Sequence, residues 1–118
     1  MAFLQRGAVA ALDQGEPFLQ QLKDVCQQNL DYVVDQFSGL NTVEFARPDG
    51  TFYFLFRKQG LADCRRFAIE LIDQANVGTA PGSAFGEAGR GFVRICFARS
   101  PESFRTAVDR LSAALASA

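Results

Sequence analysis

Apolar residues recur every three or four positions in several stretches of the chain, and this spacing predicts amphipathic helices. The clearest stretches are residues 16–37 and 61–75, followed by a helix that begins at Ser100-Pro101. A short Ala-rich helix is expected at residues 2–13, before the break at Gly15. The stripe that should bury the long second helix consists of Phe18, Leu22, Val25, Cys26, Leu30, Val33, Val34 and Phe37.

Between the helices, short apolar runs bounded by turn residues predict β-strands. We expect strands at Thr42–Ala46, Thr51–Phe56 and Phe92–Ala98, with a four-residue hairpin connection at Arg47–Gly50. Residues 76–79 read as a brief extended piece, and the Gly-rich residues 80–91 as an irregular loop. The sum is a single α+β domain over residues 1–118, with a small, mostly antiparallel sheet of three or four strands and helices packed on one face.

Composition excludes several function classes. The net charge of −1 argues against nucleic acid or an anionic membrane as a partner, and no apolar run approaches the roughly 20 residues that a membrane span needs. Histidine is absent, which removes Ser-His-Asp and Cys-His catalysis and any histidine metal site, so no metal is expected. The odd number of cysteines (Cys26, Cys64 and Cys96) favours reduced core thiols in a cytoplasmic protein.

Arg94 is the candidate for function because it interrupts an otherwise apolar strand, Gly91-Phe92-Val93-Arg94-Ile95-Cys96-Phe97-Ala98. Burying a guanidinium is costly unless it meets an acceptor, and its planar fork matches a carboxylate. On pattern alone, an arginine at a sheet margin that reaches out to water is the plainer interpretation. The pattern therefore leaves both a structural and an anion-binding role open.

Two segments resemble a known family. The family is the class I/II aminotransferases. Its P-x-G-x-F-Y element is similar to Pro48-Asp49-Gly50-Thr51-Phe52-Tyr53. Its C-terminal small domain resembles the run Ala80-Pro81-Gly82-Ser83-Ala84-Phe85-Gly86 together with the strand that follows. These are pyridoxal-phosphate enzymes of the aspartate-aminotransferase fold type. Leu4 to Leu12 resembles the segment after the lysine region of the family, so residues 1–14 are expected to form a helical connection to a large domain outside these 118 residues.

The resemblance implies that Arg94 binds the α-carboxylate of the substrate. Ser83 and Phe85 are expected to shape the entrance of the site, and Tyr53 to line it. No catalytic or cofactor-binding residue is expected in this chain: Lys23 and Lys58 lack the family's Ser/Thr-x-x-Lys setting and are expected to be solvated. Pyridoxal 5′-phosphate would be the cofactor of the intact enzyme, bound by the large domain of the same polypeptide.

The expected activity is transfer of an amino group between an amino acid and a 2-oxo acid by a homodimeric enzyme, with the isolated chain inactive. Three alternatives stay open: a stand-alone amino-acid-binding regulatory module, a lyase or decarboxylase of the same fold, and a structural dimerisation domain. The identity of the amino acid donor and of the 2-oxo acid acceptor is open as well.

Overall fold

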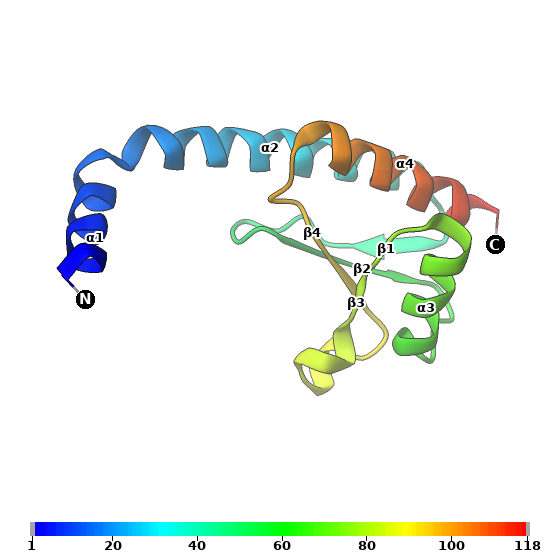
Figure 1. Cartoon of the computed structure of the whole chain (residues 1–118). Helices are drawn as coiled ribbons and strands as arrows, with labels where there is room; N and C mark the ends of the chain where they lie inside the picture. The colour runs from blue at the N-terminus through cyan, green and yellow to red at the C-terminus, as the bar shows by residue number, and fades with distance from the viewer. Residues whose placement is uncertain (1, 118) are drawn as a thin grey trace.

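The computed structural model describes residues 2–117 as α-helices and short strands in the order that the sequence predicts. The elements are α1 (Ala2–Gln14), α2 (Glu16–Ser38), β1 (Val43–Phe45), β2 (Tyr53–Lys58), α3 (Cys64–Ala75), β3 (Ala80–Pro81), the 3₁₀ turns η1 (Gly82–Phe85) and η2 (Glu87–Gly89), β4 (Val93–Cys96) and α4 (Pro101–Ala116). Figure 1 shows α2 and α4 side by side along the sheet, with α1 projecting beyond it.

The four strands form one antiparallel sheet in the order β1-β2-β4-β3. Phe45 pairs with Phe56 between β1 and β2, and Leu55 pairs with Arg94 between β2 and β4. β3 pairs with β4 only at Ala80 and Pro81. The predicted α+β class, with a mostly antiparallel sheet and helices on one face, is confirmed.

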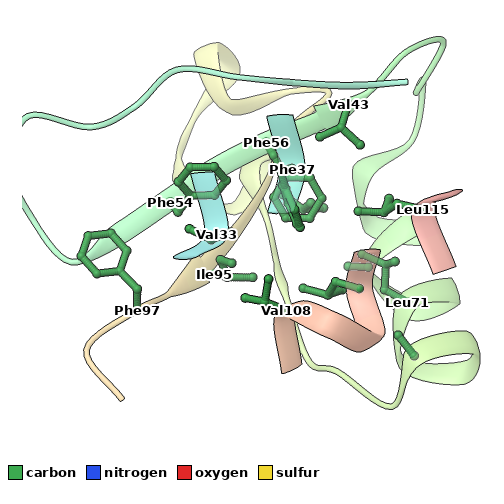
Figure 2. Packing of buried hydrophobic residues seen from close by; sticks show 14 of the residues in the cluster. Val33, Phe37, Val43, Phe54, Phe56, Leu71, Ile95, Phe97, Val108 and Leu115 are labelled. Carbon is green, nitrogen blue, oxygen red and sulfur yellow. The ribbon is translucent and has the colours of Figure 1, made fainter. Parts of the chain in front are cut away.

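A cluster rich in phenylalanine joins the sheet to the helices (Figure 2). Phe37 of α2 meets Phe54 and Phe56 of β2 at ring-centre distances of 5.8 and 5.0 Å, edge to face in both cases, an arrangement that aromatic pairs favour. Ile95 of β4 points into the same cluster, where Leu71 of α3 and Val108 of α4 also lie. Val93 of β4 belongs to this cluster as well. Alternate residues of β2 and β4 therefore face the core, which leaves the intervening ones on the opposite face.

Three local predictions differ from the structure. The connection between β1 and β2 runs from Ala46 to Phe52, longer than the four residues expected, because β1 ends at Phe45 and β2 begins at Tyr53, which pairs with Cys96 of β4. Helix α3 starts at Cys64 rather than at residue 61, since the Asp63 side chain accepts hydrogen bonds from the backbone of Arg65 and Arg66 and caps it there. The region expected to be an irregular loop begins with the short edge strand β3.

The buried stripe predicted for α2 is wrong at its N-terminal end. Phe18 and Leu22 are exposed, and the buried positions begin at Asn29. Helix α1 has no buried residue, although Phe3 and Leu12 are apolar. The periodicity was correct for a helix, but the sheet of residues 2–117 reaches only the C-terminal half of α2 (Figure 1).

Asn29 is the one polar side chain of residues 2–117 that is buried with the core. Its Nδ2 donates to the backbone carbonyls of Phe97 and Arg99, each at 2.9 Å. These carbonyls follow Cys96, the last residue of β4 that pairs with β2, where the chain turns into α4. Asn29 therefore ties α2 to the segment that fixes the end of β4.

The cysteines were expected to be core thiols. All three are free, but only Cys64 is buried, while Cys26 and Cys96 are half-buried. Burial is the main cause that raises the pKa of Cys26, and the nearby Cys96 adds to it. The core-thiol prediction is thus correct for Cys64 and too strong for the other two.

Candidate functional site

Arg94 lies on the face of the sheet that the helices leave open. Its strand neighbours Val93 and Ile95 are buried in the core, whereas Arg94 itself is half-buried. Its guanidinium carbon lies 3.6 Å from the centre of the Phe85 ring and 3.9 Å from the centre of the Tyr53 ring. The guanidinium is therefore held between two aromatic rings, one from the η1 turn and one from β2.

No ion pair between residues 2–117 involves Arg94. The arginines that do form ion pairs are Arg47, Arg57, Arg66 and Arg90. Among the described residues, the arginine side chains that donate hydrogen bonds to carboxylates are Arg47, Arg57 and Arg66, and not Arg94, although it is half-buried. Because aromatic rings are weak acceptors and no described carboxylate pairs with Arg94, its N–H donors remain available for an anion.

A cavity of about 750 Å³ begins at Arg94 and Tyr53 and extends to the first turns of α4. It lies where the pairing of β3 with β4 stops at Arg94, beside residues 76–79, which precede β3 in the chain. Arg99 and Arg110 also line it, and Glu102 is the one carboxylate among its lining residues. A cavity of this size with an excess of cationic groups suits a small anionic molecule.

Phe85 reaches Arg94 because backbone contacts hold the η1 turn against the start of β4 and against η2. Gly82 donates its N–H to the carbonyl of Phe92 at 2.8 Å, and a Cβ at Gly82 would lie only 2.1 Å from the carbonyl oxygen of Gly89. The turn ends at Gly86, whose φ of +112° disfavours any other residue. These glycines allow the loop to double back on itself and to present Phe85 outward.

Cys64 and Ser83 form a second anchor for this turn. The Cys64 Sγ and the Ser83 Oγ are hydrogen-bonded at 3.3 Å. The Ser83 hydroxyl is the largest of the causes that lower the pKa of the Cys64 thiol, and backbone N–H groups of Ser83 and Gly91 add to it, against the effect of burial. Sequence patterns gave no signal for this contact, because the two residues are joined only by the fold.

The four site residues predicted from the sequence thus fall into two groups. Arg94, Phe85 and Tyr53 meet in one stack, whereas Ser83 binds Cys64 and supports the turn. Asn29 and Cys64 were missed as positioning groups. An Asn on the buried stripe of a helix was a visible signal, because a buried amide needs partners.

The described residues do not fit a pyridoxal-phosphate site. An aminotransferase needs a lysine beside the bound substrate, and neither lysine of the chain lines the cavity at Arg94. Lys23 is exposed on α2, and Lys58 ends β2 near Gly60. Within residues 2–117 we also find no helix suited to crossing a membrane and no group of three side chains suited to a metal.

Comparison with known proteins gives a consistent result. The chain is 29% identical over 116 residues to an aspartate aminotransferase of Musicola paradisiaca, covering 97% of this chain and 29% of the relative. It is 30% identical over 109 residues to a probable N-acetyl-LL-diaminopimelate aminotransferase of Bacillus subtilis, covering 91% of this chain and 27% of the relative. The chain therefore spans less than a third of the length of these relatives.

Solved structures agree with the sequence comparison. The aspartate aminotransferase from Rhizobium meliloti superimposes with a TM-score of 0.77 at 28% identity, over 92% of this chain and 29% of that one. An alanine aminotransferase from Pyrococcus furiosus gives a TM-score of 0.84 at 23% identity, over 94% and 29%, and shows the same fold. The family profile described as aminotransferase class I and II matches residues 1–111. The chain belongs to the class I and II aminotransferase family.

Proposed function

We propose that this chain supplies the substrate-carboxylate site of an aminotransferase, with Arg94 as the residue that binds the α-carboxylate. The observation that carries the proposal is a half-buried guanidinium with no ion pair among residues 2–117, at the mouth of a cavity of about 750 Å³. A bidentate contact between its free edge and a carboxylate would fix the substrate in one orientation.

The amino-transfer chemistry comes from pyridoxal phosphate, the cofactor of this family. Because residues 2–117 do not fit that cofactor, a larger domain of the same polypeptide would bind it. The exposed apolar side chains of α1 and α2, among them Phe3, Leu12 and Phe18, support such a domain contact. We place the intact enzyme in the cytoplasm as a homodimer, acting on an amino acid and a 2-oxo acid.

The first test compares two proteins. The 118-residue chain, with added pyridoxal phosphate, an amino acid and 2-oxoglutarate, should show no turnover. The longest polypeptide encoded in frame with Met1 is then assayed as wild type and as Arg94→Lys. If that polypeptide is active, we expect Arg94→Lys to raise KM on the order of tenfold or more, because lysine keeps the charge but loses the fork. Unchanged kinetics would overturn the role of Arg94.

An amino-acid-binding regulatory module is the second candidate. It is favoured by the fact that the chain forms the cavity at Arg94 with its own residues. Calorimetry on the 118-residue chain with a panel of amino acids separates the two. Micromolar binding of one amino acid would support the regulatory module. If the chain is instead part of an enzyme, it contacts only the carboxylate of an amino acid, and we expect it to bind every amino acid of the panel weakly.

A further inference from the structure

We propose that Cys64 is a positioning residue for Arg94, because its sulfur holds the loop of residues 82–91 so that the Phe85 ring lies on the Arg94 guanidinium. The action of Cys64 runs through Ser83 and Phe85. Its consequence for substrate binding rests on the proposed carboxylate role of Arg94, whereas its consequence for the position of Phe85 does not.

The loop of residues 82–91 has little apolar anchorage of its own. Gly82 is its one buried residue, and Phe85, its largest apolar side chain, is 54% exposed. Gly82 donates its N–H to the carbonyl of Phe92 and packs backbone to backbone against Gly89. These contacts close the base of the loop, but they do not set the direction in which the η1 turn presents Phe85. That direction must depend on polar contacts of the turn.

Cys64 supplies such a contact from a fixed support. It is the first residue of α3 and 4% exposed, and the Asp63 side chain caps the helix beside it. The Cys64 Sγ is hydrogen-bonded to the Ser83 Oγ at 3.3 Å. The Ser83 hydroxyl, followed by backbone N–H groups of Ser83 and Gly91, lowers the pKa of the thiol against the effect of burial. One sulfur therefore contacts both the start and the end of the loop.

The 3₁₀ geometry of η1 links the position of Ser83 to that of Phe85. A 3₁₀ helix has three residues per turn, so side chains two residues apart point about 120° apart. Ser83 points toward Cys64 of α3, and the Phe85 ring centre lies 3.6 Å from the guanidinium carbon of Arg94. Without the bond at Ser83 the turn can rotate, and Phe85 leaves Arg94. The arginine then regains rotamer freedom that it must lose again to bind an anion.

The test is NMR of the 118-residue chain, with the Arg94 Nε–H signal as the readout and acetate as the probe ligand. An aromatic ring lying on the guanidinium shifts this signal upfield, so Phe85→Ala defines the downfield position of the unstacked side chain. Cys64→Ala and Ser83→Ala should each lower the ratio of stacked to unstacked turns on the order of fivefold, which moves the signal part of the way downfield. Acetate should bind Cys64→Ala on the order of threefold more weakly than the wild type.

A double-mutant cycle separates this role from a general loss of packing. If Cys64 and Ser83 act through one bond, the double alanine variant should move the Arg94 signal no further than the larger single change. Cys64→Ser keeps a hydroxyl group and should lie closer to the wild type than Cys64→Ala does. Cys26→Ala removes a half-buried thiol from α2 and should leave the signal unchanged. The Nε–H signal of Arg105, which lies over a different ring, should stay constant in every variant.

The outcomes separate this inference from the proposed function. An Arg94 signal that stays in place in both Cys64→Ala and Ser83→Ala would overturn the positioning role. Two single changes that add in the double variant, or a movement shared with Cys26→Ala, would overturn it as well.

The acetate titration tests the consequence for binding. A moved Arg94 signal with unchanged acetate affinity would overturn the effect of Cys64 on binding. If acetate does not move the Arg94 signal of the wild type, the carboxylate role itself is contradicted, while the variants still decide how Phe85 is held. Partial movement in both single variants, no addition in the double variant and weaker acetate binding would support both proposals.

Discussion

The two faces of the β2–β4 strand pair are built from alternating residues, and one face packs in the core while the other carries the candidate site. On the helix side, Phe54, Phe56, Val93 and Ile95 are buried in the core. On the open side, Leu55 is exposed and its partner Arg94 is half-buried between two rings. The alternation of a strand lets one short sequence supply a dry core and a charged site at once.

Aromatic rings serve both faces in different ways. Phe37, Phe54 and Phe56 contact one another edge to face or tilted and bury their apolar area. Phe85 and Tyr53 instead offer ring faces to a cation. Stability should therefore depend on the first set, while the second set should matter mainly for what Arg94 binds.

Phe37→Ala should have the largest effect on stability. Phe37 is fully buried and touches rings of both β1 and β2, so its loss leaves a cavity at the centre of the cluster and should cost about 3–5 kcal/mol. Chemical denaturation of the 118-residue chain measures this. Phe18→Ala removes the same side chain from an exposed position on the same helix and should cost far less. Equal losses would contradict the assignment of the core.

Asn29→Ala tests the polar contact within the covered face. It would leave the carbonyl of Arg99 without its Asn29 donor and the carbonyl of Phe97 with only the backbone N–H of Arg99, and we expect a loss of about 2 kcal/mol in the free energy of unfolding. Gln28→Ala, at the exposed neighbouring position, is the control. A loss no greater than that of the control would show that water replaces Asn29 without cost.

Gly82→Ala should disturb the open face more than the core. A Cβ at this position meets backbone oxygens of Gly89 and Phe92 at 2.1 and 2.8 Å, so the turn must shift and Phe85 must move from Arg94. We expect a global loss of about 1 kcal/mol together with a clear change in the NMR signal of Arg94. Gly78→Ala has no atom within 4 Å of the added Cβ and should change neither. A loss of global stability in Gly82→Ala without any change in the NMR signal of Arg94 would contradict the separation of the two faces.

The sequence predicts the covered face better than the open one, for a physical reason. Hydrophobic periodicity reports which side of an element is buried, and it identified Phe37, Val33 and Leu71 correctly. It failed at Phe18 and Leu22 because it cannot tell which neighbour covers a stripe, and the sheet ends before reaching them.

The sequence named the residues of the candidate site but not the way in which they are arranged. A charged residue in an apolar strand singled out Arg94, and the family resemblance added Tyr53, Phe85 and Ser83. The stack itself depends on how residues 82–91 fold back, which is decided by backbone contacts between Gly82 and Gly89 and by the Cys64–Ser83 bond. No local pattern reveals these contacts, because Cys64 and Ser83 are 19 residues apart and the glycines meet only when the loop folds back.

Tyr32→Phe should have the smallest effect on stability, because it tests a contact between two helices at the surface of the covered face. The Tyr32 hydroxyl donates to Asp109 at 2.5 Å, joining α2 to α4, and this bond is the main cause that raises the pKa of Tyr32 above its ordinary 10.0. A raised pKa means that the stabilisation is complete below pH 10 and is lost as pH rises through the folded-state value. Because the pair is near the surface, we expect less than about 1 kcal/mol at neutral pH. Denaturation at pH 7 and above pH 10 should show the wild type approaching the Tyr32→Phe variant at high pH, and a difference that persists or grows there would contradict the role of this hydrogen bond.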